Sequence, residues 1–166
     1  MIKENLYTPG RIRTFTGKYV SPILITPDQV DIIDIAHSLS MQCRFGGHAR
    51  RFYSVAQHSV HVADLVNNSD LSLAALLHDA SEAYMVDLPK PIKELLPDYV
   101  KMENRVMSAI GEKFGIPKEK FDSVKEADRI ALEYEWESNV VAEADIRCWS
   151  PSESYQHFID LFKILV

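Results

Sequence analysis

Four side chains of the types that bind metal ions occur in three separate segments of this chain. Two of them are adjacent, in the mostly apolar stretch 76–84, where an unpaired buried carboxylate would be costly. Two imidazoles and two carboxylates form a mixed nitrogen and oxygen set, which suits Mn, Fe, Co, Ni or Zn better than Ca. Water activated by such an ion is what hydrolysis requires. The predicted ligands are His58, His78, Asp79 and Asp128.

These ligands need a scaffold, and the local sequence predicts one made of helices. Capping boxes, in which Ser or Thr is followed three residues later by Glu or Gln, predict four helix starts. The starts are Thr26, Ser54, Ser123 and Ser150. His58 follows the second start, and Asp128 lies in the first turn after the third. The His78–Asp79 pair falls inside an expected continuous helix over residues 70–84.

Two further helical features are expected. A helix over residues 98–114 should end at Gly115, because glycine tolerates the positive φ of a helix C-terminus. The helix that carries Asp128 is expected to run through apolar residues that recur at helical spacing, namely Ala127, Ile130, Ala131, Tyr134 and Val141. Together with the capping boxes, these features predict an all-α helical bundle.

The two ends of the chain add little chemistry. Between Thr14 and Ile25, β-prone residues broken by Gly17 and Pro22 predict a short hairpin. No internal repeat or long linker divides the sequence. Residues 1–166 are therefore expected to form a single domain.

Composition excludes several classes of protein. With 46% hydrophobic and 25% charged residues in 166, a compact fold is expected, and no stretch approaches the length of a membrane span. A cytoplasmic location is expected, with Cys43 and Cys148 reduced. The net charge of −6 argues against binding to long nucleic acid, although basic residues near the N-terminus leave room for a small anion. Whether copies of the chain associate is left open.

The order of the metal-binding types resembles the pattern of the HD-domain superfamily of metal-dependent phosphohydrolases. That pattern is a His, a later His-Asp pair and a final Asp on a downstream helix, here His58, His78–Asp79 and Asp128. The segments Val-Ala-Gln-His, His-Asp-Ala-Ser-Glu and Asp-Leu-Pro-Lys-Pro-Ile-Lys look like the nucleotidase branch, which includes 5′-deoxynucleotidases and phage-type dATP triphosphohydrolases. The resemblance covers about residues 44–128 and implies an HD-type helical bundle. Because residues 80–127 contain no His, one catalytic ion is favoured over two.

Two acidic residues follow the His-Asp pair and are predicted to be catalytic. Glu82 is four residues after His78, so on a helix it would lie beside the ligands and could orient or deprotonate the attacking water. The alternative is a solvated carboxylate at a helix end. Asp87 could equally be a turn residue before Pro89. The resemblance implies that Asp87 acts beside Glu82, as a proton donor or as a second base.

Substrate contacts are expected from Arg44, Phe45 and Lys93. Arg and Lys suit phosphate oxygens, and the resemblance supports both as phosphate contacts and Phe45 as an aromatic near the sugar or base. Ordinary solvated cations and a core phenylalanine are the alternatives. Further basic residues near the Gly46–Gly47 loop could reach a longer phosphate chain. They are His48, Arg50, Arg51 and Lys90.

These features predict divalent-metal-dependent hydrolysis of a nucleotide phosphate. The ion is one of Mn, Co, Zn, Fe, Ni or Mg, and the partner is a small-molecule nucleotide. The 5′-deoxynucleotidase reaction, from dNMP to deoxynucleoside and phosphate, is slightly favoured because two cations match the charge of a monophosphate. A dNTP triphosphohydrolase that releases triphosphate is one alternative. A non-catalytic HD module that senses a nucleotide is another.

Overall fold

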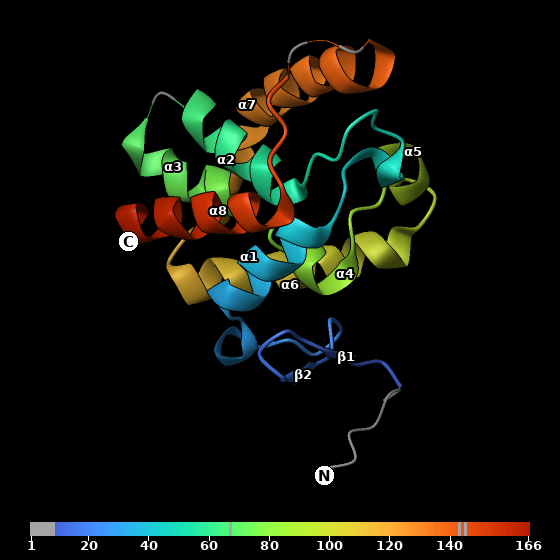
Figure 1. The fold of residues 1–166 in the computed structure, drawn as a ribbon. Coiled ribbons are helices and arrows are strands. Elements are labelled where there is room, and N and C mark those ends of the chain that lie inside the picture. The colour runs from blue at the N-terminus through green and yellow to red at the C-terminus, as the bar shows by residue number, and fades with distance from the viewer. Residues whose placement is uncertain (1–8, 67, 143, 145) are drawn as a thin grey trace.

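The computed structural model describes residues 9–66, 68–142, 144 and 146–166. Over these residues the chain is a bundle of α-helices preceded by a short β-hairpin (Figure 1), so the predicted helical fold and the predicted hairpin are confirmed. None of the described helices is both long and apolar enough to cross a lipid bilayer. The elements are β1 (Ile12–Arg13), β2 (Tyr19–Val20), α1 (Ile32–Met41), α2 (Val55–Leu65), α3 (Ser69–Leu76), α4 (Glu82–Met85), α5 (Lys90–Lys93), α6 (Pro97–Phe114), α7 (Lys118–Trp136) and α8 (Pro151–Leu165).

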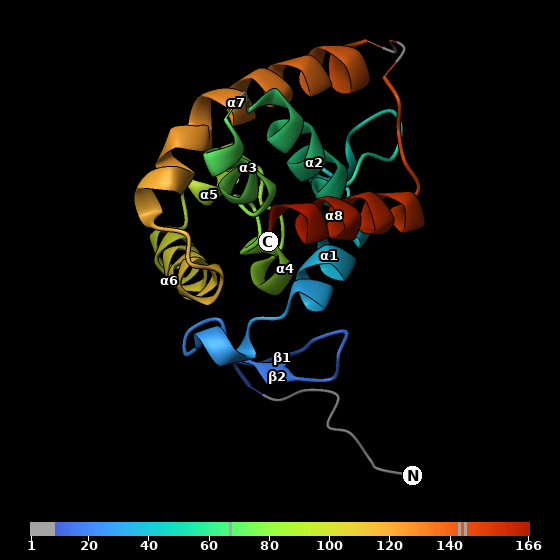
Figure 2. The same cartoon turned by 90° about the vertical axis from the view of Figure 1, so that its left-hand side faces the viewer.

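Helix α2 is the centre of the bundle, because it packs against α1, α3, α7 and α8. Figures 1 and 2 place α7 at one end of the bundle and the hairpin at the opposite end. The core around α2 is apolar and closed to solvent. Its largest buried side chains include Ile35, Leu39, Val62, Leu76 and Phe158. A polar side chain on the inner face of α2 therefore needs partners from the neighbouring helices.

The hairpin is tied to the bundle by one buried carboxylate. Its strands are antiparallel, with Ile12 opposite Val20, and Gly17 in the turn has a φ of 90°. The backbone N–H and the hydroxyl of Thr16 donate to the two oxygens of Asp34 on α1, at 2.7 and 2.9 Å. The first strand begins before Thr14, slightly earlier than the sequence pattern predicts.

Two of the four predicted capping boxes start α-helices. The Ser54 hydroxyl accepts the backbone N–H of Gln57 at the start of α2, and Ser150 forms a complete box with Glu153 at the start of α8. The helix expected over residues 98–114 is α6, which begins one residue earlier, and Gly115 caps it with a φ of 67°.

The other two predicted starts do not begin α-helices. Thr26 forms its capping box with Gln29, but the box starts only a short 3-10 helix (Pro27–Gln29), and α1 begins separately at Ile32 with Asp31 as its cap. Ser123 lies inside α7, where its hydroxyl donates to a backbone carbonyl one turn earlier. Helix α7 begins earlier because the fixed φ of Pro117 suits the start of a helix. No helix-breaking residue lies between Pro117 and Ser123, so the helix continues through Ser123.

The continuous helix expected over residues 70–84 is also wrong. Helix α3 ends at Leu76, four residues of turn follow Leu77, and α4 begins at Glu82. The backbone leaves helical geometry at Leu77, where φ is −105° and ψ is 9°. The run of apolar residues there satisfies helical periodicity, yet tertiary contacts decide the local conformation. The His-Asp pair consequently sits in a turn and not on a helix face.

The end of α6 makes a prediction about stability. The N–H of Ile116 donates to the carbonyl of Gly111 at 2.8 Å, so the chain folds back over this glycine. A Cβ added at Gly111 would lie 2.7 Å from the Ile116 carbonyl oxygen. Gly111→Ala should lower the free energy of unfolding by about 1–3 kcal/mol, although alanine is the better helix former. Urea denaturation measures this, and Ser108→Ala, at an exposed site on the same helix, should change it by less than about 0.5 kcal/mol. A stabilised Gly111→Ala protein would contradict the packing described here.

Candidate metal centre

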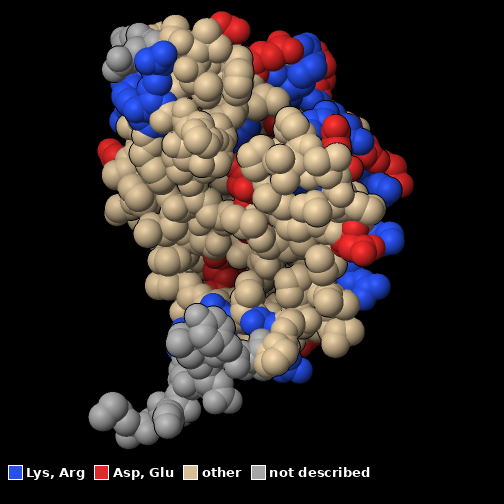
Figure 3. All heavy atoms as spheres, turned by 90° about the vertical axis from the view of Figure 1, so that its right-hand side faces the viewer, with Lys and Arg blue, Asp and Glu red and all other residues tan. Residues whose placement is uncertain are grey.

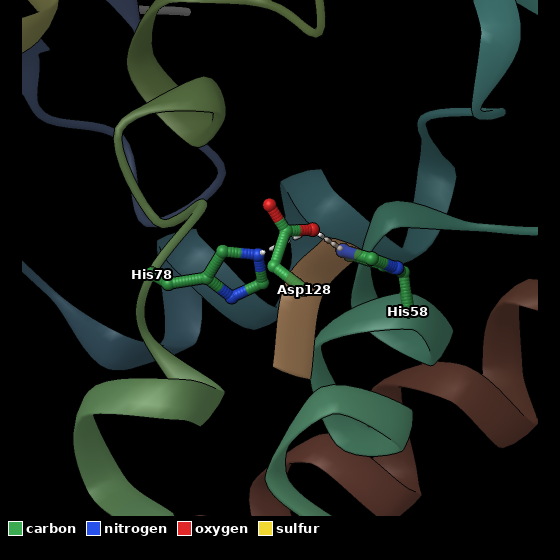
Figure 4. A group of neighbouring side chains, drawn as sticks. All are labelled: His58, His78 and Asp128. Atoms are coloured by element: carbon green, nitrogen blue, oxygen red, sulfur yellow. Dashed lines mark hydrogen bonds and ion pairs between the residues drawn. The ribbon is translucent and has the colours of Figure 1, made fainter. Parts of the chain in front are cut away.

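Three parts of the bundle bring the predicted metal ligands together. His58 comes from α2, Asp128 from α7, and His78 from the turn between α3 and α4, and their side chains point at one another (Figure 4). One ligand atom from each lies within 4.8 Å of the other two. The Nε2 of His58 is 3.0 Å and the Nε2 of His78 is 3.6 Å from Asp128 Oδ1.

Asp79 completes this group. Its Oδ2 lies 3.2 Å from the Nε2 of His78 and 3.7 Å from the Nε2 of His58. Both residues of the pair can face the same point because they occupy a turn, where consecutive side chains need not diverge by the 100° of a helix. Asp79 therefore places a further carboxylate beside the group of three, next to both imidazoles.

Backbone contact orients the imidazole of His78. Its Nδ1 lies 2.7 Å from the carbonyl oxygen of Ala75, so Nδ1 carries the proton and donates it. Its Nε2 is buried without a hydrogen-bond partner among the described residues and points to the two carboxylates. An unpartnered buried nitrogen aimed at acidic oxygens is what a metal ligand requires before the ion binds.

A buried carboxylate orients the imidazole of His58. The side chain of His58 is fully buried, and its Nδ1 lies 2.8 Å from Oε1 of Glu135, which is also fully buried. Donation from Nδ1 to this carboxylate leaves Nε2 to face the convergence point. A carboxylate behind a ligating histidine fixes the tautomer and raises the basicity of the ligand.

Glu135 was missed from the sequence, although it anchors the site. Its second oxygen lies 2.9 Å from Nε of Arg44, and the Tyr53 hydroxyl faces the same carboxylate. Burial alone would raise the pKa of Glu135, but His58 and Arg44 hold it well below its usual range. A signal was present: Glu135 lies seven residues, two helical turns, after Asp128, and so on the same face of α7.

The apolar row predicted for α7 is only partly buried. Ala131 is buried, whereas Ile130 and Tyr134 are 45% and 48% exposed. The buried side of the helix also carries the acid Glu135, which hydrophobic periodicity cannot find. The acids on this side of α7 meet the imidazoles of α2 and of the α3–α4 turn.

The ionisation of the ligand carboxylates follows from their neighbours. Burial would raise the pKa of Asp79, but His78 and His58 bring it below its usual range. Asp128 behaves alike: burial acts against ionisation, and the neighbouring imidazoles of His58 and His78 outweigh it and lower its pKa. Both carboxylates are therefore charged at neutral pH and available to a cation.

A cleft of about 860 Å³ opens beside this centre. Figure 3 views the molecule from the side that carries α5 and shows acidic atoms recessed between uncharged lobes. The structure brings the predicted site residues outside the imidazole pair to its walls. They are Arg44, Phe45, Asp79, Glu82, Asp87, Lys93 and Asp128.

Glu82 is a buried acid at the start of α4. Its Oε2 has no hydrogen-bond partner among the described residues, and Nζ of Lys93 lies 3.9 Å from Oε1. Burial raises the pKa of Glu82 well above its usual range, and the charges of Asp79 and Asp87 add to this. The solvated helix-end alternative is thereby ruled out, because Glu82 is only 5% exposed.

Asp87 follows a strained residue. Val86, between α4 and Asp87, has a φ of 103°, which a β-branched residue rarely adopts. The backbone N–H of Asp87 donates to the Gln42 side chain at 2.9 Å, which fixes the chain there. Burial raises the pKa of Asp87, Arg44 opposes the shift, and Asp79 adds to it. Glu82 and Asp87 are thus two cleft acids that hold protons more readily than ordinary carboxyls.

The basic residues divide into two groups. Arg44 is 7% exposed, and its Nη1 lies 3.6 Å from Asp79, while Lys93 is paired with Glu103 at 2.6 Å. Both line the cleft, as do Lys90 and His48. Arg44 and Lys93 are therefore already held in place by acidic partners.

Arg50 and Arg51 do not line the cleft. Their guanidinium groups donate to backbone carbonyls at and beyond the end of α7: Arg50 to Val140 and Val141, and Arg51 to Ala144 and Ile146. These carbonyls belong to a π-helical turn and to the segment that follows, where unpaired acceptors gather. The suggestion that both arginines reach a phosphate chain is wrong for this conformation.

The residues present fit a divalent cation. Three carboxylates whose lowered pKa keeps them ionised, those of Asp79, Asp128 and Glu135, lie against the two imidazoles, and Arg44 is the arginine in contact with them. This surplus of negative charge attracts a cation, and both imidazoles present Nε2 inward. His61 stays outside the group, with its Nδ1 3.6 Å from Glu135. A metal site is thus supported by charge and by orientation; which metal it takes is a separate question.

Glu135 generates a prediction about metal affinity. In Glu135→Gln the amide has one acceptor oxygen, so it cannot serve both the His58 N–H and the Arg44 guanidinium, which are donors. The affinity for Mn²⁺ or Zn²⁺ should fall about 10- to 100-fold, as for other groups that orient a ligand from behind. Calorimetric titration of chelator-treated protein measures it. Glu119→Gln, at an exposed position of the same helix outside the cleft lining, is the matched control and should keep the affinity of the unmodified chain. Equal affinity in Glu135→Gln would contradict the role assigned to this carboxylate.

Comparison with known proteins shows relatives but no activity. No family model matches the chain. "Uncharacterized protein YfdR" of Escherichia coli is 49% identical over 121 residues, which are 73% of this chain and 67% of YfdR. "Uncharacterized protein RCAP_rcc00048" of Rhodobacter capsulatus is 34% identical over 114 residues, 63% of this chain and 58% of that protein. Neither name states a substrate or a reaction. From its identity and coverage, the chain belongs to the same family as YfdR.

Proposed function

We propose that this protein is a metal-dependent phosphohydrolase that acts on nucleotide phosphates, with deoxynucleoside monophosphates as the favoured substrates. The observation that carries the proposal is the convergence of His58, His78, Asp79 and Asp128 at the edge of a cleft that also holds two protonatable acids and two cations. The resemblance to HD-domain phosphohydrolases supports it and remains a prediction.

A divalent ion held by these four residues would supply Lewis acidity, which polarises a phosphoryl oxygen and makes water a stronger acid. The side chains of the cleft supply the rest. Arg44 and Lys93 neutralise the negative charge of the phosphate, because both are cations fixed at the cleft wall. Their acidic partners keep them in place before the substrate arrives.

Two proton transfers complete the reaction. The water oxygen attacks phosphorus as the bond from phosphorus to the sugar oxygen breaks. Glu82 accepts the proton of the water, and Asp87 donates a proton to the departing sugar oxygen, so that a nucleoside and phosphate result. The surroundings of the two acids differ, and the raised pKa of Glu82 makes its ionised form a stronger base toward the water proton.

The length of the phosphate chain bears on the substrate. A triphosphate carries more negative charge than a monophosphate and needs additional cations. With Arg50 and Arg51 bonded to backbone carbonyls, Lys90 and His48 are the remaining basic residues that line the cleft beside Arg44 and Lys93. The displacement of the two arginines supports the monophosphate over the dNTP triphosphohydrolase alternative, while Lys90 and His48 are the cations left for a longer phosphate chain. A sensor without catalysis is less well supported, because Glu82 and Asp87 both line the cleft.

A substrate panel tests the proposal. Chelator-treated protein should be inactive, and Mn²⁺ or Co²⁺ should restore release of inorganic phosphate from deoxynucleoside monophosphates. Phosphate, pyrophosphate and triphosphate are measured separately for mono-, di- and triphosphates. The restored ion should also raise the melting temperature, since a ligand bound only by the folded state stabilises it. Full activity without metal would refute the proposal, and triphosphate as the dominant product would reverse the substrate preference.

Glu82 offers a test of the proton transfer. Glu82→Gln keeps the shape of the side chain but removes the base, so kcat should fall about 10²- to 10⁴-fold. Metal content, measured by mass spectrometry, should match that of the unmodified protein, because Glu82 is not among the four proposed ligands. Glu94→Gln, at a position outside the cleft lining, is the control and should keep full activity. Loss of the metal together with activity would mean that Glu82 is itself a ligand.

A further inference from the structure

The cleft has an aromatic wall that the metal-centred chemistry does not use. Trp136, at the end of α7, is 47% exposed and lines the cleft with Phe45 and Leu132. The rings of Phe45 and Trp136 meet edge to face, with centroids 5.8 Å apart. A large aromatic side chain left exposed inside a concave surface is typical of a ligand-binding site.

Helix α7 sets the distance between this aromatic wall and the proposed metal centre. Asp128, Leu132, Trp136 and Val140 recur every four residues and all line the cleft. Trp136 lies eight residues beyond Asp128, which corresponds to roughly 12 Å along the helix axis. This spacing is comparable to the length of a nucleoside monophosphate. A ligand with its phosphate at the metal centre would bring its base to Trp136.

The wall is held rigidly. The side chain of Asn139, 1% exposed, accepts the backbone N–H of Arg51 and donates to the Arg51 carbonyl, both at 3.0 Å. The N–H of Arg50 donates to the Asn139 carbonyl at 2.7 Å. These bonds join the loop that carries Phe45 to the segment after Trp136. Phe45 itself has a φ of 58°, a strained conformation that such anchoring maintains.

Charge gives the cleft a direction. Beyond Asp128, the charged residues of α7 and of the π-helical turn that line the cleft are Glu133 and Glu137. Glu137 repels a phosphate, and Glu133 does so less strongly because Arg129 pairs with it, whereas Arg44 and Lys93 attract one. A nucleotide would therefore lie with its phosphate toward Arg44 and its uncharged base toward the aromatic wall.

We infer that Trp136 is the stacking platform for the nucleobase, with Phe45 as its edge-on support, so that the C-terminal half of α7 forms the base subsite. The inference rests on the proposed function for the choice of a nucleotide. Base stacking on an aromatic ring tolerates any base, because every base has a π-face. The subsite therefore selects mononucleotides over base-free sugar phosphates, with little preference among bases.

Fluorescence tests this subsite without catalysis. The chain has two tryptophans, so Trp149→Phe leaves Trp136 as the single tryptophan fluorophore. Trp149 lies outside the cleft lining, and its ring stacks on that of His157 with centroids 4.2 Å apart. The full-length variant is titrated in Mg²⁺ with the phosphonate analogue of deoxyadenosine monophosphate, whose carbon–phosphorus bond resists hydrolysis. Saturable quenching is expected. The corresponding base-free sugar phosphonate should leave the emission unchanged, and equal quenching by it would overturn the inference.

Affinity provides the second measurement. Trp136→Ala should weaken calorimetric binding of the nucleotide phosphonate roughly 5- to 100-fold. Trp136→Phe should restore most of the affinity, and the base-free phosphonate should bind both variants as it binds the unmodified chain. Unchanged nucleotide binding in Trp136→Ala overturns the inference even if the enzyme hydrolyses nucleotides. Base-dependent quenching without any hydrolysis would refute the proposed function and leave the subsite standing.

Discussion

The burial of His58 between two carboxylates is the constraint on which the site depends. Its imidazole has no exposed surface, and its two nitrogens lie 2.8 Å from Glu135 and 3.0 Å from Asp128. Both acids come from α7, seven residues or two helical turns apart, and each contacts one nitrogen of the ring. The position of α7 on α2 is therefore set by polar contacts as well as by packing. The whole cleft inherits this geometry, because α7 forms one of its walls.

The same constraint explains why the centre suits a cation. Ionised Asp79, Asp128 and Glu135 lie against the two imidazoles, and such concentrated negative charge disfavours the folded state unless it is compensated. Arg44 compensates part of it, through contacts with Glu135 and Asp79. A divalent ion would compensate more, and its binding free energy would add to the stability of the fold. The buried carboxylates and the proposed chemistry therefore both favour a bound cation.

The sequence allows some of this to be predicted and not the rest. Residue type and order identify His58, His78, Asp79 and Asp128, because histidine and aspartate pairs in apolar segments need partners wherever the chain folds. Periodicity could not reveal Glu135, since the inner row of α7 is polar and its exposed side carries Ile130 and Tyr134. It also could not reveal the turn at residues 77–81, where an apolar run imitates a helix. In both places tertiary polar contacts override the local pattern.

Long cations posed a similar difficulty. Arg44, Arg50 and Arg51 lie within eight residues of one another, and their types alone suggest a single anion-binding cluster. In the fold, one of them faces the cleft and the other two bind carbonyls at the end of α7. Composition reports how many guanidinium groups a loop carries but not which acceptors the neighbouring chain leaves unpaired.

The contacts of Arg44 also link two sites that the chemistry treats as separate. This cleft-facing cation and the ligand His58 bear on opposite oxygens of one buried carboxylate, Glu135. A change in the charge or position of Arg44 or of His58 therefore alters the electrostatic environment of the other, because the carboxylate between them has no access to water. Occupation of the proposed metal position and affinity for the proposed phosphate would then be coupled through Glu135, and by linkage the coupling would act equally in both directions.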